Sequence, residues 1–319
     1  IMVMLGGVTR LTDSGLSMVD WRPITGWLPP INLQEWQAIF ELYKATPEYI
    51  KINVGMDIEG FKSIFWLEYL HRLWGRIIGI AFFVPFLWFL ARGQLGTRLA
   101  LKLVLMFALG GAQGVLGWLM VKSGLVDRPD VSQYRLTAHL GLAILIYAYM
   151  FWVALGLLSH LNPRTLPTGL RRLTGFSVFW VFLTMLAGGF VAGLDAGLSY
   201  NTFPLMDGKF VPDGLWSMSP AFLNIFENVT TVQFDHRIMA YGTIFLVGLT
   251  CWRARVHGLS VREMLPFHFF GTLVIVQGVL GVATVIWAVP ISLAALHQLV
   301  AFLLLTAGLW SLHSLRITR

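Results

Sequence analysis

Charged side chains are scarce in this chain of 319 residues. Asp, Glu, Lys and Arg together make up 12% of it, whereas hydrophobic residues make up 56%. A soluble domain carries roughly 25% charged residues, so the composition excludes an ordinary water-soluble protein. Cysteine is scarcer still, because Cys251 is the single one in the sequence. One cysteine excludes an intramolecular disulfide.

Long apolar runs take the place of charge. A membrane-spanning helix needs about 20 apolar residues, and seven runs of that kind occur. An eighth stretch, IMVMLGGV, opens the sequence but is only about 12 Å long as a helix, and residue 1 is not Met. We expect it to be the end of a first span that begins before this sequence, which gives an all-α integral membrane protein with eight transmembrane helices. The seven complete runs lie near 66–91, 99–121, 134–158, 173–194, 233–251, 264–287 and 291–313.

The charges that are present lie unevenly between the connections. The connections near 92–102, 159–172 and 252–263, together with the C-terminal tail, hold eleven Lys and Arg residues and one acid, Glu263. The alternate connections hold nearly all the other acids. This asymmetry is typical of proteins whose basic loops face the cytoplasm or the mitochondrial matrix. The net charge of +7 therefore indicates topology, and we expect no nucleic-acid partner.

The longest outer connection, 13–64, contains the segment NLQEWQAIFELYK. Asn32 can cap a helix there, with Glu35 three residues later to complete the cap. Apolar residues recur on one face of that helix, which predicts an amphipathic helix lying on the membrane or over the helix bundle. The face consists of Trp36, Ile39, Phe40 and Tyr43.

Four blocks of the first half of the chain recur in the same order in the second half. Their shared order predicts an internal repeat whose two copies have the same orientation. The blocks are GGVTRLTDSGLS (6–17) with GGFVAGLDAGLS (188–199), LEYLHR (67–72) with VQFDHR (232–237), AQGVLG (112–117) with VQGVLG (276–281), and TAHLGLA (137–143) with ALHQLVA (295–301).

The repeat predicts two pseudosymmetric four-helix bundles. We place the first bundle at 1–158 and the second at 173–319. The basic segment 159–172 is then a linker on the inner side of the membrane.

Four of the eight histidines lie a few residues inside the outer end of their helices. Two imidazoles that face each other across a four-helix bundle commonly hold a haem iron, so each half is predicted to bind one haem. A pair of ligands for copper or zinc is the alternative, although no Cys or Met lies at ligand spacing. These four are His71, His139, His236 and His297; the four expected to be structural are His160, His257, His268 and His313.

Glycines and arginines accompany these histidines. The glycines would let a flat macrocycle approach the helices, or they pack helices closely. Arg72 and Arg237, each next to a candidate ligand, are predicted to pair with haem propionates; the alternative is that they extend to the membrane interface. The glycines are Gly79, Gly110, Gly111, Gly114, Gly117 and Gly141 in the first half, and Gly242, Gly278 and Gly281 in the second.

The repeat is broken at Glu68, which corresponds to Gln233 in the second half. Glu68 precedes His71 by three residues and so shares its helix face. A carboxylate in a partly apolar site can act as an acid, a base or a stabiliser of positive charge. The alternative is a simple helical ion pair with Arg72. We favour a functional Glu68, which makes the first half the reactive site and the second half the site of a resident cofactor.

Several segments together resemble the haem A synthase family over essentially the whole chain. They include GGVTRLTDSGLSMVDW, EYLHRLWGR, QGVLGWLMVKSGL, QYRLTAHLG, GGFVAGLDAGLSYNTFP and VQFDHR. The resemblance implies an eight-helix membrane enzyme that oxidises a methyl group of haem O to a formyl group, giving haem A for cytochrome oxidase. Some bacterial members carry a cysteine pair in an outer loop. This chain lacks that pair and is similar to the alphaproteobacterial and mitochondrial branch.

The resemblance also implies roles for individual residues. His71 and His139 would flank the substrate haem, while His236 and His297 would bind a resident haem b. Glu68 matches the essential carboxylate of the family.

The expected location is a bacterial or mitochondrial inner membrane, with the haem sites toward its outer face. Expected partners are the lipid bilayer, haem O, haem A, a haem O synthase, cytochrome oxidase assembly factors, an electron donor and a second copy of the chain. Two rival functions stay open. One is a di-haem b electron-transfer cytochrome, and the other is a haem carrier or assembly factor that binds haem without chemistry.

Overall fold

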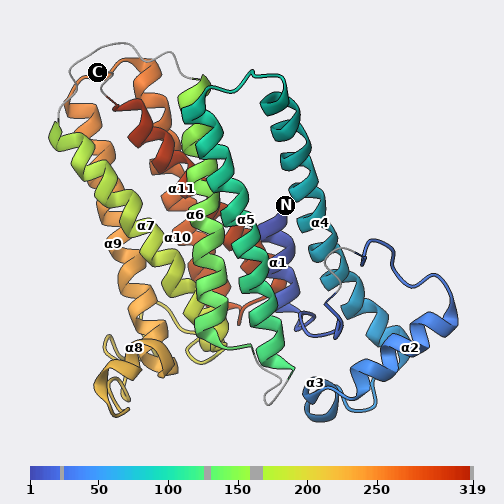
Figure 1. The fold of residues 1–319 in the computed structure, drawn as a ribbon. Helices are drawn as coiled ribbons and strands as arrows, with labels where there is room; N and C mark the ends of the chain where they lie inside the picture. Colours follow the sequence, from blue (N-terminus) through green and yellow to red (C-terminus); the bar gives the residue numbers. More distant parts are fainter. Residues whose placement is uncertain (22–24, 126–130, 159–167, 317–319) are drawn as a thin grey trace. The chain divides into compact units, whose positions relative to one another are not determined.

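The computed structural model describes residues 1–21, 25–125, 131–158 and 168–316. Regular structure in those ranges is helical, apart from an isolated antiparallel bridge between Met206 and Lys209. The predicted all-α class is therefore confirmed (Figure 1). The elements are α1 (Met2–Leu11), α2 (Leu33–Lys44), α3 (Pro47–Lys51), α4 (Ile58–Ala91), α5 (Thr97–Gly124), α6 (Gln133–Leu158), α7 (Thr168–Gly193), η1 (Ala196–Leu198), η2 (Ala221–Leu223), α8 (Asn224–Glu227), α9 (Val229–Val256), α10 (Val261–Ile286) and α11 (Ile291–Ser314).

Six helices in the described part of the chain are long and apolar enough to cross a membrane, namely α4, α5, α6, α7, α10 and α11. The protein is therefore a multi-pass membrane protein. The run predicted at 233–251 does form a helix, α9, of 28 residues. It is less apolar than the other six because Gln233, Asp235 and Arg237 interrupt it. α1 is a short apolar helix at the start of the chain.

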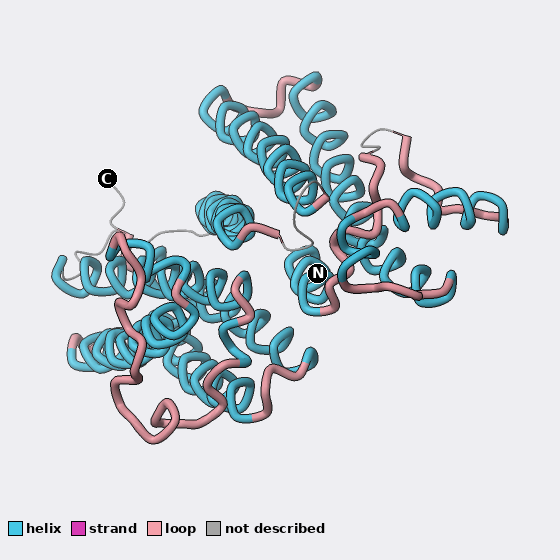
Figure 2. Tube along the Cα trace, turned by 90° about the horizontal axis from the view of Figure 1, so that it is seen from below, coloured by secondary structure: helices cyan, strands magenta, loops and turns pink. Residues whose placement is uncertain are grey.

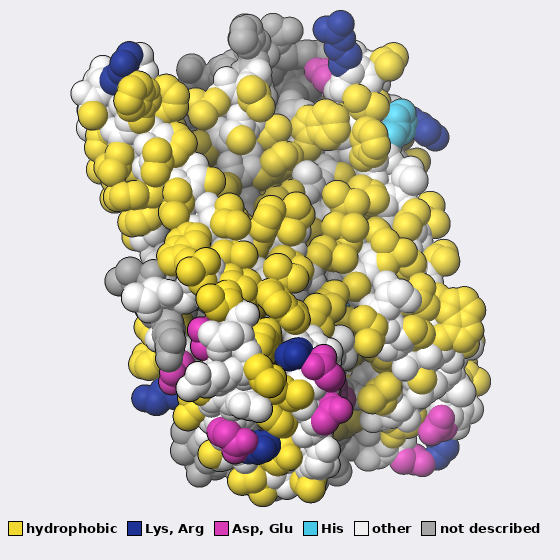
Figure 3. All heavy atoms as spheres, turned by 90° about the vertical axis from the view of Figure 1, so that its right-hand side faces the viewer, with side chains coloured by type: hydrophobic (Ala, Val, Ile, Leu, Met, Phe, Trp, Pro, Cys, Tyr) yellow, Lys and Arg dark blue, Asp and Glu magenta, His cyan; other side chains and the backbone are white. Residues whose placement is uncertain are grey.

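The surface agrees with burial in lipid. On the face shown in Figure 3, hydrophobic side chains cover the middle, and charged side chains gather toward the two ends. Long apolar side chains on α4 and α5, including Val84 and Leu101, are more than half exposed in the protein alone. Exposed apolar area of this extent is what a bilayer covers.

α2 forms as the sequence predicts. The side chain of Asn32 accepts a hydrogen bond from the backbone N–H of Glu35 at 2.9 Å, and the carboxylate of Glu35 accepts one from the Asn32 amide at 2.7 Å. The apolar face of α2 is covered by α4, so α2 lies over a helix of the protein. The buried cluster consists of Trp36, Phe40 and Tyr43 of α2 with Phe61, Phe65 and Tyr69 of α4.

α4 begins earlier than predicted. The apolar run starts near residue 66, but the helix starts at Ile58, where the side chain of Asp57 accepts a hydrogen bond from the Gly60 backbone N–H at 2.8 Å. Hydropathy alone misses this extension because its apolar residues contact α2 and not lipid. The extension carries Phe61 and Phe65 into the cluster with α2.

The described chain divides into two compact units, Ile1–Ile146 and Tyr147–Arg319. In the second unit, α7 packs against α9, α9 against α10, α10 against α11, and α11 against α7, which closes a four-helix bundle. Figure 2 shows these four helices grouped together at the lower left. In the first unit α4 packs against α1 and α5. The predicted linker 159–172 stays a prediction, because residues 159–167 lie outside the described ranges.

The repeat is visible in the backbone as well as in the sequence. Asp13 follows α1 with a φ of 47°, and Asp195 follows α7 with a φ of 49°. Asp is one of the few side chains that tolerate this left-handed conformation. Matched positions of the two halves therefore make the same turn after matched helices.

Candidate haem sites

The four histidines singled out in the sequence meet two by two. His71 of α4 and His139 of α6 lie close enough to interact electrostatically within the first unit. His236 of α9 and His297 of α11 do the same within the second unit. All four side chains are half-buried. Each unit therefore brings two imidazoles together from two different helices.

Each of the four imidazole rings lies against a glycine of a neighbouring helix. A Cβ atom at any of these glycines would lie between 2.9 and 3.1 Å from a ring atom, so any larger residue would displace the ring. The same repeat positions are used in both units. The contacts are Gly6 with His71, Gly117 with His139, Gly188 with His236, and Gly281 with His297.

The sequence indicated Gly117 and Gly281 as places where a macrocycle could approach. The structure instead gives them to the imidazole rings themselves. Gly6 and Gly188 were missed as site residues. The signal that could have found them is the repeat, because each of them opens the first matched block.

The other glycines differ between the two units. In the first unit, a Cβ atom at Gly79, Gly110 or Gly111 would meet no heavy atom within 4 Å among the described residues, and the same holds for Gly114. In the second unit, a Cβ atom at Gly242 would lie 2.8 Å from the indole nitrogen of Trp180. These four glycines of the first unit thus leave open space, whereas Gly242 permits close packing against Trp180.

A glutamine accompanies one histidine in each unit. The Nε2 atom of Gln113 lies 3.3 Å from Nε2 of His139, and the Nε2 atom of Gln277 lies 3.3 Å from Nε2 of His297. The Oε1 atom of each glutamine is buried and has no partner among the described residues. The internal repeat pairs Gln113 with Gln277, and in the structure both make the same contact with a histidine.

Buried polar atoms without partners surround both pairs of histidines. The Nδ1 atoms of His139, His236 and His297 have no hydrogen-bond partner among the described residues. Leaving a buried polar atom unpaired costs about 1–3 kcal/mol, so such a cluster indicates a site built for a further group.

Two nitrogen ligands per site suit a haem. A haem iron already has the macrocycle's nitrogens and needs axial ligands only, whereas a structural zinc takes four ligands from the protein. In the described part of the chain, no group of three or more His, Cys, Asp or Glu could hold a metal ion. The residues present therefore fit haem better than copper or zinc.

Glu68 is 2% exposed, and both oxygens of its carboxylate accept hydrogen bonds. Oε2 accepts a hydrogen bond from Oγ of Ser17 at 2.7 Å and from the backbone N–H of Met18 at 2.9 Å. Oε1 accepts one from Arg72 at 2.5 Å. The ion pair with Arg72 that the spacing allowed does form, and it is buried. Glu68 thereby ties the segment after α1 to α4, next to His71.

Gln233 makes the neutral version of this contact. Its Nε2 donates to the backbone carbonyl of Tyr200 at 3.2 Å, and Tyr200 is the repeat counterpart of Met18. The two units thus share the tie between helix and loop. They differ in that the first unit places a carboxylate there.

Arg72 and Arg237 also behave alike. Arg72 donates to the carbonyls of Met18 and Asp20 at 3.0 and 3.2 Å. Arg237 donates to the carbonyls of Tyr200 and Thr202 at 2.7 and 2.9 Å. Each arginine therefore holds the outer loop of its own unit, and pairing with propionates stays a prediction.

The other histidines have different surroundings where the structure describes them. His313 is buried, packs edge-on against Trp152 with ring centroids 5.0 Å apart, and contacts Arg316. His257 and His268 are exposed. His160 lies outside the described residues.

Comparison with known proteins agrees with this arrangement. A protein of Nitrosospira multiformis named "Heme A synthase" is 53% identical over 318 residues, covering 99% of this chain and 89% of its own length. One of Paramagnetospirillum magneticum with the same name is 50% identical, covering 99% and 90%, and one of Nitrosomonas eutropha is 48% identical, covering 97% and 88%. The profile of the COX15-CtaA family, described as cytochrome oxidase assembly protein, matches residues 1–309. The chain belongs to this family.

Proposed function

We propose that the protein is a haem A synthase, a membrane oxidoreductase that converts a methyl group of haem O into the formyl group of haem A. The observation that carries the proposal is the repeated pair of histidines, each ring lying against a glycine. The proposal is also supported by relatives named "Heme A synthase", whose sequences are about 50% identical to this one over nearly the whole chain.

The proposed architecture has eight transmembrane helices in two four-helix bundles, with α1 counted as the first helix. His71 and His139 hold the substrate haem, and His236 and His297 hold a resident haem b. The basic inner connections and the C-terminus face the cytoplasm or matrix, so both haem sites lie toward the outer side of the inner membrane. Haem O synthase and oxidase assembly factors are the proposed protein partners.

The open and packed glycines support this assignment of the two units. A substrate has to enter and its product has to leave, which requires space beside the ligands. Gly110, Gly111 and Gly114 provide such space on α5 of the first unit. A resident cofactor stays in place, and the second unit is a closed bundle in which Gly242 and Gly278 pack against side chains.

Bound haem supplies the redox chemistry of the iron and its conjugated ring. The chain's own residues orient and surround the macrocycle. The glycines fix the planes of the imidazole rings, and Gln113 and Gln277 hold one ring of each pair from the side. Arg72 and Arg237 close the outer loops over the helix ends and are the proposed propionate partners.

Glu68 is the proposed catalytic carboxylate. Oxidation of a methyl carbon develops positive charge, which a fixed negative charge nearby stabilises. All three hydrogen bonds to Glu68 can persist during this electrostatic role. Proton transfer would require one of them to be exchanged, so charge stabilisation is the role that the contacts favour.

Identification of the bound haems by mass tests the function. Haem O, a hydroxylated derivative or haem A, together with haem B, is the result expected of a synthase. Haem B alone would indicate a di-haem electron-transfer cytochrome. Haem O that stays unmodified both with oxygen and a reductant and with an added electron acceptor would indicate a carrier.

Replacement of Glu68 tests the site. Glu68→Gln keeps the shape of the side chain and removes its charge, so haem A formation should fall roughly 100-fold, as for other losses of electrostatic stabilisation, while haem O stays bound. Glu41→Gln, on an exposed carboxylate of α2, is the control. Normal haem A formation by Glu68→Gln would refute the role.

A further inference from the structure

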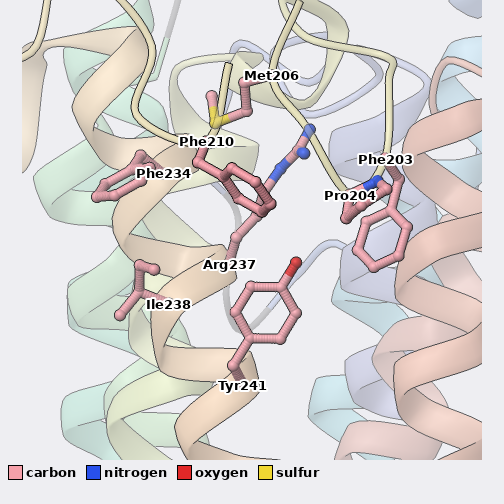
Figure 4. Close-up of a pocket in the computed structure, with 8 residues that line it drawn as sticks. All are labelled: Phe203, Pro204, Met206, Phe210, Phe234, Arg237, Ile238 and Tyr241. Carbon is pink, nitrogen blue, oxygen red and sulfur yellow. The ribbon is translucent and has the colours of Figure 1, made fainter. Parts of the chain in front are cut away.

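A cavity of about 320 Å³ lies in the second unit, between the outer half of α9 and the loop that precedes it. Figure 4 shows that it is walled mainly by aromatic and aliphatic side chains, with the Arg237 side chain running along it. From the loop it is lined by Phe203, Pro204, Met206 and Phe210, and from α9 by Phe234, Arg237, Ile238 and Tyr241.

The cavity opens on a different face of α9 from His236, although Arg237 borders both the cavity and the proposed haem site. Its α9 residues recur at spacings of three and four and so share one helix face. At about 100° per residue, Tyr241 lies roughly 140° around the helix from His236. Ile238 and Tyr241 are 49% and 43% exposed. The cavity therefore opens on the side of α9 that faces away from the histidine pair, where lipid-soluble molecules have access.

One hydrogen-bond donor faces this otherwise apolar cavity. Arg237 supplies none, because both of its terminal nitrogens are used by loop carbonyls and its Nε atom is buried out of reach of the cavity. Tyr241 directs its hydroxyl toward the loop in Figure 4. A ligand that carries an acceptor oxygen can pair with this hydroxyl.

The first unit shows what kind of group belongs there. At the matched offset Phe234 corresponds to Tyr69, and Tyr241 corresponds to Arg76. Tyr69 donates its hydroxyl proton to the backbone carbonyl of Trp27 at 2.6 Å, and Arg76 lies over the Trp27 ring at 5.9 Å. The first unit thus covers this helix face with a flat aromatic ring and a carbonyl oxygen from its own chain.

The second unit has no counterpart of α2 in its described outer loop, and it leaves a cavity at the matched position. We propose that this cavity binds a membrane quinone, whose flat head group carries carbonyl oxygens and whose apolar tail extends into the bilayer. The head supplies a flat ring, as Trp27 does in the first unit, and its carbonyl oxygen accepts from the Tyr241 hydroxyl, because Phe234 stands where the first unit has the donor Tyr69. Phe203, Phe210 and Phe234 provide faces on which it stacks.

The proposal rests on the proposed function in one respect, since it names the redox partner of the same enzyme. Conversion of a methyl to a formyl group removes four electrons and balances as R–CH3 + H2O + 2 Q → R–CHO + 2 QH2, where Q is the quinone. A quinone site on the lipid-facing side of α9 lets the membrane pool take up these electrons and protons.

Photolabelling of the purified holoprotein tests the site. An azido-substituted short-chain ubiquinone is irradiated with the protein in detergent, and the labelled peptides are mapped by mass spectrometry. Label is expected in residues 203–241, and unmodified quinone should displace it while phosphatidylglycerol should not. Phe234→Leu and Tyr241→Phe should each reduce the label about five-fold, the effect of losing one aromatic or hydrogen-bonding contact.

Phe245→Leu is the matched control, because Phe245 lies on the same helix, is 68% exposed and lies outside the cavity. Label that is unchanged in Phe234→Leu and Tyr241→Phe, or is displaced equally by phosphatidylglycerol, would overturn the proposal. Haem absorbance reports folding of each variant, and Tyr241→Phe removes only one oxygen.

The haem content of the same samples separates the two proposals. Haem A formation without quinone label overturns the quinone site alone. Quinone label in a protein that contains haem B alone leaves the cavity's ligand in place and overturns the proposed synthase.

Discussion

Four glycines determine where the imidazole rings of the two sites can lie. Because a Cβ atom at each would come within about 3 Å of a ring atom, the glycine is required for the position of the ring and not for a special backbone conformation. This predicts an unusual response to the mildest substitution. Gly→Ala in a helix ordinarily stabilises it by roughly 0.5–1 kcal/mol, so any loss has to come from the displaced ring.

We expect Gly281→Ala to weaken haem binding in the second unit. The added Cβ atom would lie 3.0 Å from Cε1 of His297 and would turn or push the ring. Haem B content should fall several-fold, and the haem that remains should show a changed electron paramagnetic resonance spectrum. Gly248→Ala on α9 is the control, since a Cβ atom there meets nothing within 4 Å among the described residues. Equal haem content and spectra in the two variants would contradict this account.

Glu48, which lies outside the membrane-spanning helices, is expected to make the stability of the α2–α3 segment depend on pH. Glu48 of α3 is 2% exposed, and burial raises the pKa of its carboxyl group from the ordinary 4.5 to about 7, while a hydrogen bond from Tyr43 opposes the shift. Between these two values the folded state retains a proton that the unfolded state releases. The stability of the α2–α3 segment should therefore fall as pH rises from about 4.5 to about 7 and then level off.

The size of this effect is on the order of 3 kcal/mol, at about 1.4 kcal/mol per pH unit. Hydrogen–deuterium exchange of residues 33–51, measured from pH 5 to pH 8 and corrected for the intrinsic rate, should show it. Glu48→Gln should flatten the profile, and Glu41→Gln, on an exposed carboxylate, should leave it unchanged. Protection that rises with pH would have the wrong sign and would exclude Glu48 as its origin.

At the scale of elements, the position of α2 depends on one cluster of aromatic rings. Phe61 of α4 is fully buried and contacts three rings of α2, with centroids 6.4 Å from Trp36, 5.1 Å from Phe40 and 5.1 Å from Tyr43. Phe61→Ala should cost about 3–5 kcal/mol at this contact. We expect limited proteolysis to cut within 28–56 at a rate increased at least ten-fold, while haem B stays bound to the second unit.

Leu42→Ala is the control, because Leu42 lies on α2 outside the aromatic cluster and is 46% exposed. It should leave the cleavage rate close to that of the unmodified protein. If Phe61→Ala released haem B as well, the second unit would depend on this cluster, contrary to its own closed set of contacts.

Local signals made part of the elements predictable. The cap at Asn32 and the apolar spacing of Trp36, Phe40 and Tyr43 are contained within a dozen residues, and the sequence identified α2 from them. The start of α4 was missed because it depends on contacts between α2 and α4. The donors to Glu68 were also beyond reach, since Ser17 precedes Glu68 by 51 residues and no periodicity links them.

At the scale of the whole molecule, the internal repeat was the strongest source of prediction. It paired His71 with His236 and His139 with His297, and the structure brings together one pair in each unit. An internal repeat identifies residues that have the same role in both copies, which is why the four histidines could be predicted. It cannot reveal where the copies differ, and the cavity beside Tyr241 lies on the face of α9 that corresponds to the face of α4 covered by Trp27.

Orientation in the membrane is the last property that the sequence predicts for the whole chain. Positively charged segments are retained on the inner side, so the connections after α4 and α9 should be inside and the segments with α2 and Lys209 outside. Because Cys251 is the single cysteine, Cys251→Ser gives a cysteine-free protein into which one new cysteine at a time can be introduced.

In intact cells, a membrane-impermeant maleimide should label Glu41→Cys and Lys209→Cys. Gln94→Cys and His257→Cys should react only after the membrane is permeabilised. Labelling of all four sites in intact cells would show that the cells leak, whereas the reverse pattern in sealed cells would invert the topology and place both haem sites toward the cytoplasmic side.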